Sequence, residues 1–166
     1  ILKFLIKTST FTILKKFTMK HLSILLIALF SFNNLSAQKY TTKYITDANK
    51  VGLQWWNNVN SGQYSTSYQY LSSELKKRFS EESWLNQISI LMDEFGQLEE
   101  RSVSDTYFNS EIEGYESGFY VIVEYNVEYS KTKNHTESIL LKQNDQLEWK
   151  IFDFNYEFQN LESTEE

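Results

Sequence analysis

Few side chains in this sequence have the types and spacing that catalysis or metal binding requires. The only histidine after residue 37 is His135, in the polar stretch KTKNHT, and we expect it to be a solvated turn residue rather than a base. No Gly-x-Ser-x-Gly turn, EF-hand spacing or histidine pair on a helix face occurs. Without cysteine, thiol catalysis and zinc–thiolate sites are excluded. Acidic groups at 93–94 and 99–100 could attract calcium weakly, but we interpret them as solvent-facing charge. We therefore expect no metal and no cofactor.

One carboxylate, that of Asp153, has the potential to act as a general acid or base. Asp153 alternates with Trp149 and Ile151, so burial of that face would raise the pKa of its carboxyl group and set it near a tyrosine donor. The opposite face is richer in aromatic residues, and we favour its burial, which leaves Asp153 in water. That face comprises Phe152, Phe154, Tyr156 and Phe158.

Aromatic residues and one arginine are the best candidates for a ligand-binding site. Trp55 and Trp56 are adjacent in a helical segment and cannot both point in one direction, so one of them can line a cavity or a partner surface. The alternative is that the aromatic side chains all pack helices onto a sheet. Arg101 lies in a segment that otherwise lacks positive charge, and an internal ion pair with Glu137 is favoured over an anion site. The candidate binding residues are Trp55, Trp56, Tyr64, Tyr68, Arg101 and Trp149.

Helices are predicted for the first part of the chain after residue 43. Apolar residues recur there at three- and four-residue steps, up to Phe95. Ser80 is suited to be the N-cap of the last helix, and Gly96 to follow its C-terminal end. The predicted helices cover residues 44–62, 64–79 and 81–95.

Strands are predicted after Gly96, where the apolar period changes to two. The clearest alternation is in FYVIVEYNVEY, residues 119–129. The predicted strands cover residues 101–108, 119–129, 136–142 and 147–158. Because short polar links join the last three, we expect antiparallel pairing. The chain is thus predicted to be an α+β domain with three N-terminal helices packed on a four-stranded antiparallel meander sheet.

The segment MKHLSILLIALFSFNNLSA, residues 19–37, has the layout of a secretory signal peptide. A basic start precedes an apolar run over 22–32, and the small residue Ala37 marks the expected cut. The alternative is a membrane anchor, but a span needs roughly 20 apolar residues, about twice this run. We interpret residues 1–18 as translated sequence upstream of the true start, with an amphipathic targeting segment as the weaker alternative. Residues 38–160 then form one domain and 161–166 a disordered tail. We expect a periplasmic or extracellular protein with no stable membrane anchor.

The part after the predicted cut is strongly acidic. Residues 1–37 hold five of the 16 Lys+Arg and none of the 22 Asp+Glu, so the net charge of the remainder is 11 − 22 = −11. Such a surface repels phosphate backbones and anionic lipid headgroups, which argues against nucleic acid as a partner and against docking on membranes.

Several motifs occur in an order that resembles a known family. They are WNNVNSGQYSTSY (56–68), SEESWLNQI (80–88), FGQLEERSV (95–103) and EWKIF (148–152). This order is similar to that of the bacterial family called domain of unknown function 4019, over roughly residues 56–157. The family's characteristic positions fall on Trp56, Gly62, Tyr64, Trp84, Gly96, Leu98, Arg101, Gly118, Tyr120, Glu137, Trp149 and Lys150.

The chain departs from that family pattern at two places. It has no proline, whereas the family usually has one near 110–116, and it has Asp153 where the family tends to have glycine. The resemblance implies an exported small α+β domain and no particular reaction. The order of elements is also analogous to the cone-shaped cystatin-like and nuclear-transport-factor-2-like folds, an analogy of architecture that does not dictate function.

Two functions remain compatible with these residues. The preferred hypothesis is a non-catalytic exported module that binds a small apolar ligand or a protein partner. The alternative is a small isomerase- or hydrolase-like enzyme that uses a buried carboxylate and a tyrosine in a sheet-lined cavity. The position of Asp153 discriminates between them, because only the enzyme needs this acid inside a closed apolar pocket within hydrogen-bond reach of a tyrosine.

Overall fold

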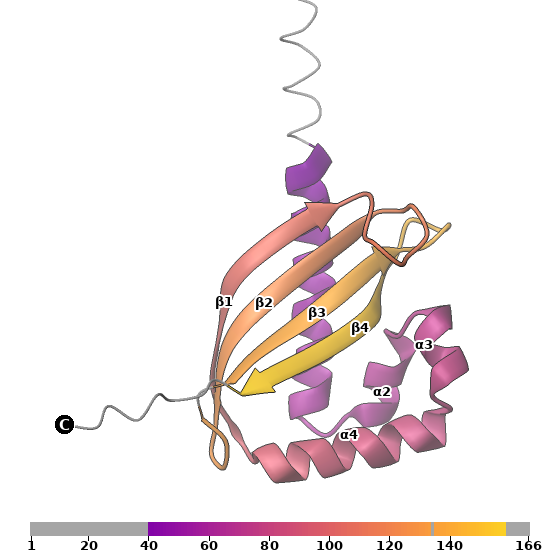
Figure 1. Ribbon diagram of the computed structural model, residues 1–166. Helices are drawn as coiled ribbons and strands as arrows, with labels where there is room; N and C mark the ends of the chain where they lie inside the picture. The colour runs from indigo at the N-terminus through magenta and orange to yellow at the C-terminus, as the bar shows by residue number, and fades with distance from the viewer. Residues whose placement is uncertain (1–39, 134, 159–166) are drawn as a thin grey trace, which may run out of the picture. The chain divides into compact units, whose positions relative to one another are not determined.

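The computed structural model describes residues 40–133 and 135–158 (Figure 1). The predicted signal peptide 19–37, the segment 1–18 and the tail 161–166 lie outside these residues. A helix over residues 40–60 comes first. The other elements are α2 (Tyr64–Gln69), α3 (Ser73–Arg78), α4 (Glu81–Phe95), β1 (Leu98–Asn109), β2 (Tyr120–Tyr129), β3 (His135–Gln143) and β4 (Trp149–Phe158).

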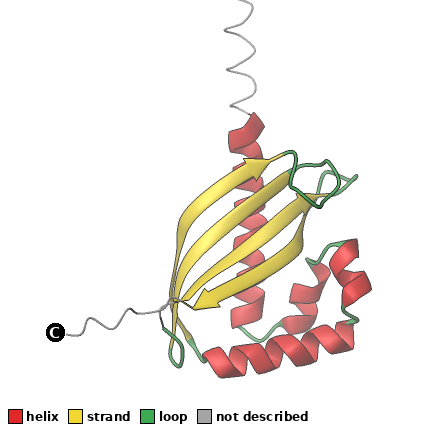
Figure 2. Cartoon of the chain, in the orientation of Figure 1, coloured by secondary structure: helices red, strands yellow, loops and turns green. Residues whose placement is uncertain are grey.

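The four strands form one antiparallel sheet in the order β1-β2-β3-β4. Residues 43–60 of the first helix cross behind the sheet, and α4 runs across one end of it (Figure 2). In β2 the inward residues Val121, Val123, Tyr125, Val127 and Tyr129 are all buried. The predicted α+β meander is therefore confirmed.

The predicted helix over 64–79 differs from the structure, because it is divided into α2 and α3. Between them the chain runs alongside β4: the Ile151 amide donates to the Tyr70 carbonyl (2.9 Å) and the Ser72 amide donates to the Ile151 carbonyl (2.8 Å). The Ser72 hydroxyl then accepts a bond from the Leu75 amide (3.2 Å) and caps α3. Bonding to a distant strand thus replaces the helical bonds that the apolar spacing favours.

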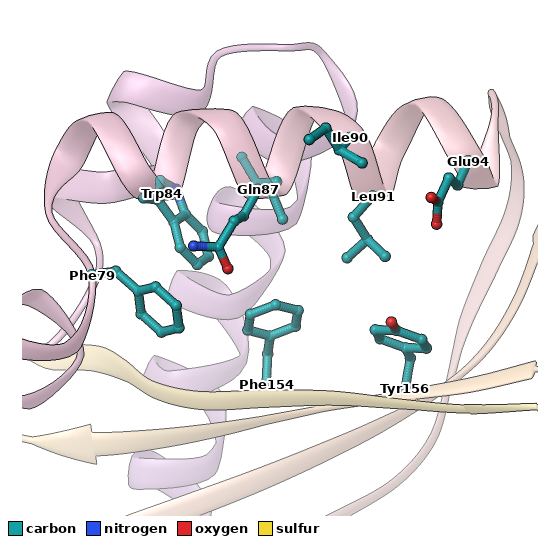
Figure 3. A pocket seen from close by; sticks show the side chains of 9 residues that line it. Phe79, Trp84, Gln87, Ile90, Leu91, Glu94, Phe154 and Tyr156 are labelled. Carbon is teal, nitrogen blue, oxygen red and sulfur yellow. The ribbon is translucent and has the colours of Figure 1, made fainter.

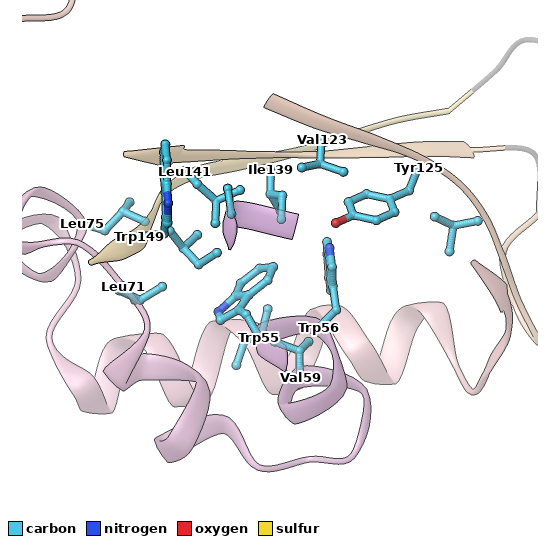
Figure 4. Close-up of a cluster of buried hydrophobic side chains, with 14 of the residues drawn as sticks. Trp55, Trp56, Val59, Leu71, Leu75, Val123, Tyr125, Ile139, Leu141 and Trp149 are labelled. Carbon is cyan, nitrogen blue, oxygen red and sulfur yellow. The ribbon is translucent and has the colours of Figure 1, made fainter. Parts of the chain in front are cut away.

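The core lies between the helix over 40–60 and the sheet (Figure 4). Trp55 and Trp56 are 0% and 1% exposed, so both adjacent tryptophans are core residues. Gly52 allows this close approach, because a Cβ at this position would overlap the Cδ1 atom of Ile139 on β3.

A β-bulge divides β4 into two halves. Leu141 pairs with Ile151 and Leu140 pairs with Asp153, which leaves Phe152 as an extra residue. Ile151 before the bulge belongs to the core cluster, and Phe154 after it is partly buried and packs against that cluster. Neither face predicted for this strand is therefore buried throughout, since the bulge exchanges the faces after Ile151.

Candidate functional site

An apolar groove of about 320 Å³ lies between α4 and β4 (Figure 3). Side chains from α4 form one wall, and aromatic rings of β4 together with Phe79 form the other. The lining residues are Phe79, Trp84, Gln87, Ile88, Ile90, Leu91, Glu94, Phe154 and Tyr156.

The α4 wall combines residues of the core stripe with residues beside it. Ser80 begins the helix, its hydroxyl accepting a bond from the Ser83 amide (3.2 Å). Trp84 and Ile88 are each 2% exposed and form the floor at the core side. Ile90 lies off this stripe and remains 51% exposed. The helix therefore presents an apolar side chain to solvent at the mouth of the groove.

The β4 wall comes from alternate residues after the bulge. Phe154 packs edge-on against Trp84 (centroids 5.8 Å apart, 86°). Tyr156 packs edge-on against Phe95 (5.2 Å, 87°) and remains 38% exposed. Phe158 continues the same face and is 56% exposed. The extra residue Phe152 thus brings a row of rings to the α4 side.

Few of the side chains that line the groove carry ionisable groups. Glu94 is the only carboxylate among the described lining residues, and it is exposed. General acid–base catalysis needs a second group placed to exchange a proton, and no histidine, lysine or arginine is among the described lining residues. No set of three His, Asp or Glu side chains that could hold a metal ion occurs within 40–133 and 135–158.

A polar cluster is buried in the core, away from the groove. The Arg101 guanidinium donates to the Glu137 carboxylate (2.6 Å) and to the Tyr129 hydroxyl (2.7 Å), and it lies 4.0 Å over the Trp56 ring. The Tyr129 hydroxyl donates to the other Glu137 oxygen (2.9 Å). Burial raises the pKa of Tyr129 above its ordinary range. The ion pair predicted between Arg101 and Glu137 is present, and its partners satisfy both carboxylate oxygens.

The prediction that His135 is a solvated turn residue is wrong, because the side chain is buried and the residue is 2% exposed. It begins β3 on the core face, stacked on Tyr129 (5.5 Å, 8°) and packed against Phe95 (5.0 Å). Its Nε2 atom lies 3.7 Å from Glu137. The alternation of His135, Glu137 and Ile139 in one strand is the signal that places it inside.

Asp153 lies outside the groove. It is half-buried, and its carboxylate accepts a bond from the neighbouring Phe154 amide (3.1 Å). It forms no hydrogen bond with a tyrosine within the part of the chain that the structure describes. The enzyme hypothesis therefore lacks the acid–tyrosine pair that it required.

The six candidate binding residues do not form one site. Trp55 packs in the core beside Trp84 (6.2 Å), and Trp149, 5% exposed, packs against Tyr44 (6.1 Å). The Tyr68 hydroxyl donates to the Phe79 carbonyl (3.1 Å), and Tyr64 lines a separate open hollow on α4.

The predictions from sequence missed the groove because a helix and a strand far apart in the chain form it. The available signals were Ile90, an apolar residue off the α4 stripe, and the alternating rings Phe154, Tyr156 and Phe158.

Comparisons with known proteins give a family and distant likenesses among solved structures. The chain is similar in fold to a Campylobacter jejuni protein described as an NTF2-like transpeptidase, with a TM-score of 0.45 and 12% identity over 63% of this chain and 96% of that one. No curated protein matches. None of the helices within the described residues is long and apolar enough to cross a membrane. Residues 51–154, more than half of the sequence, match the family described as "Protein of unknown function (DUF4019)", and the chain therefore belongs to the DUF4019 family.

Proposed function

We propose that this protein is an exported, non-catalytic binding module whose groove between α4 and β4 takes up an apolar group. The observation that carries the proposal is the exposure of Ile90 and Tyr156 at the mouth of an aromatic-lined groove of about 320 Å³. Its volume is in the range of small-molecule sites, which are mostly apolar with few polar groups. Exposed apolar side chains gathered in one place are typical of interaction sites.

Burial of apolar surface is the driving force for this binding. Ile90 is 51% exposed, so covering the rest of its side chain stabilises a complex by on the order of 1 kcal/mol. The rings of Phe154 and Tyr156 add edge and face contacts to a bound apolar group. Little rearrangement is needed, because Trp84 and Phe154 already hold each other by edge-on packing.

A catalytic role has less support from the arrangement of the acids. Glu137 is the most buried carboxylate with a tyrosine partner, but its oxygens are occupied by Arg101 and Tyr129. Glu137 is 2% exposed and does not line the groove. A substrate in the groove would therefore meet only Glu94.

Binding is tested with a neutral apolar fluorophore, 1-N-phenylnaphthylamine, titrated against the protein and two variants. Ile90→Glu should weaken binding at least tenfold, because it places a charge at the groove mouth. Leu53→Glu is the matched control: Leu53 is 56% exposed on the helix over 40–60, and it does not line the groove. Thermal unfolding of both variants reports folding. Equal affinity of the two variants would refute the groove as the site.

Export rests on the segment 19–37 and is tested separately. Intact-mass measurement and N-terminal sequencing of the protein from the extracytoplasmic fraction of its native host should give a chain that begins at Gln38. Recovery from the cytoplasm with residues 19–37 attached would contradict export and leave the groove proposal unaffected.

A further inference from the structure

We infer that the occupant of the groove is an extended peptide segment with alternating apolar and cationic residues, which adds to the outer edge of β4 as a fifth strand. This inference rests on the proposed function and names the partner of the same groove. Three observations support it: the open edge of β4, the spacing of its aromatic side chains and the charge of the surrounding elements.

The outer edge of β4 is open along the groove. β4 is the last strand in the sheet order. The outer edge of β4 pairs with residues 70–72 at Ile151. From Asp153 to Phe158 β4 pairs with β3 on its inner edge, and no described residue pairs with its outer edge. Unpaired amide and carbonyl groups at a sheet edge are a template for another extended segment.

The pairing at Ile151 is an internal example of the same binding mode. Residues 70–72 run parallel to β4, and hydrogen bonds join Tyr70 and Ser72 to Ile151. Between them Leu71 is 1% exposed and joins the core cluster. An extended segment on this edge can therefore hold its main chain on β4 while its side chain inserts beneath the sheet.

The spacing along the edge fits an alternating partner. Phe154 and Tyr156 line the groove at alternate positions, about 6.6–6.8 Å apart along a strand. An added strand has the same repeat, so every second side chain would enter the groove. The other side chains would project to the opposite face, where Asp153 and Glu157 are placed by the same alternation. Apolar residues suit the first set, and cationic residues suit the second.

The charge of α4 and β4 selects against acidic partners. Together they carry six acidic residues and one basic residue, Lys150, whose amine is 3.2 Å from Glu148. The basic residues Lys76, Lys77 and Arg78 belong to α3 and lie at the Phe79 end of the groove. A second copy of this chain would bring the same acidic edge against itself, which like-charge repulsion disfavours. A segment with Lys or Arg at alternate positions is complementary. The acidic residues are Glu81, Glu82, Asp93, Glu94, Asp153 and Glu157.

The first test uses a fluorescein-labelled peptide of about eight residues that alternates Lys with Val and Phe, and a matched peptide with Glu in place of Lys. At low salt, anisotropy should show that the Lys peptide binds at least tenfold more tightly than the Glu peptide. The variant Ile90→Glu should lose binding of the Lys peptide, and Leu53→Glu should retain it. The double variant Asp153→Asn/Glu157→Gln should weaken the Lys peptide severalfold, whereas Glu111→Gln/Glu113→Gln, in the loop between β1 and β2, should not. Equal binding of the Lys and Glu peptides overturns the charge assignment and with it the inference.

The second test concerns main-chain pairing. Two versions of the Lys peptide are compared. One is N-methylated at its odd-numbered residues and the other at its even-numbered residues, so each peptide loses the amide donors along one of its two edges. Binding of one and loss of the other is expected, because only one edge faces β4. Equal binding of the two, whether tight or weak, overturns strand addition.

Failure of this inference and failure of the proposed function give different results. If the neutral fluorophore binds in the groove and the Lys peptide does not bind, the partner assignment is overturned and the apolar site stands. If neither binds, the proposed function fails as well. A dimer in sedimentation that Ile90→Glu dissociates would make a second copy the occupant and overturn the inference.

Discussion

Arg101 and Glu137 are charged side chains that are only 7% and 1% exposed, and charged groups are costly to bury. The free energy of desolvation for each ion is several kcal/mol, and it is offset only when both remain paired. Tyr129 and the Trp56 ring complete the pairing from two further elements. The cluster therefore fixes how β1, β2, β3 and the helix over 40–60 meet.

Removing one partner of this pair should be worse than removing both. We expect Glu137→Leu and Arg101→Met each to lower the free energy of unfolding by about 3–5 kcal/mol, because each leaves an unpaired buried charge. The double variant, which has no such charge, should be more stable than either single variant. Urea unfolding of the four proteins measures this coupling, and strictly additive losses would contradict it.

The tyrosines of the same region give a prediction for alkaline pH. Burial raises the pKa of Tyr125 from 10.0 to about 12. Burial also raises the pKa of Tyr129 above its ordinary range. The folded state therefore favours the neutral form of each tyrosine. The resulting contribution to the free energy of unfolding is complete below pH 10. It declines by about 1.4 kcal/mol per pH unit per tyrosine as the pH rises from 10 to 12. Unfolding midpoints in this range should fall less steeply for Tyr125→Phe, and equal slopes would contradict the assignment.

At the scale of elements, Gly52 decides how closely the helix over 40–60 approaches the sheet. Alanine is favoured over glycine in a helix by about 1 kcal/mol, so propensity alone predicts that Gly52→Ala stabilises. Overlap of the new Cβ with Ile139 reverses the sign, and overpacking of this kind costs about 1–3 kcal/mol.

Because the overlapping atom is Cδ1 of Ile139, a second substitution should rescue the first. Ile139→Val removes that atom, so Gly52→Ala/Ile139→Val should be more stable than Gly52→Ala. Thermal unfolding of the two single variants and the double variant provides the comparison. No recovery in the double variant would place the strain elsewhere.

A helix or strand was predictable from sequence where the apolar period of its own residues determines its structure. The period of 3.6 in α4 and of two in β2 reflects burial against a single neighbour, and both agree with the structure. The division of residues 64–79 was not predictable, because bonds from Tyr70 and Ser72 to Ile151 cause it. The bulge at Phe152 likewise depends on the register of β3 with β4.

The candidate site was less predictable than the fold for the same reason. Residue type alone does not place a side chain in a site, since Trp55 and Trp56 are core residues. The groove requires that Ile90 and Phe154 face each other across a gap, and no local pattern records that gap. The ion pair of Arg101 with Glu137 was predictable, because a lone cation in an acidic strand region has few other roles.

At the scale of the whole molecule, the dominant property is acidic charge. The net charge of the full sequence is −6, and residues 38–166, which follow the predicted cut, carry 11 Lys+Arg and 22 Asp+Glu, a net charge of −11. Repulsion among these charges destabilises a compact state and is screened by salt. The buried pair Arg101–Glu137 is screened much less, because both side chains are removed from solvent.

We therefore expect moderate salt to stabilise the protein. Raising NaCl from about 0.01 M to 0.15 M shortens the screening length from about 30 Å to 8 Å and should raise the free energy of unfolding by on the order of 1 kcal/mol. The variant Glu111→Lys/Glu113→Lys changes two exposed residues that have no ion pair among the described residues and reduces the net charge to −11 + 4 = −7. Its salt response in urea unfolding should be smaller, because less repulsion remains to be screened. An equal response in both proteins would mean that salt acts through apolar burial instead, which does not depend on these charges.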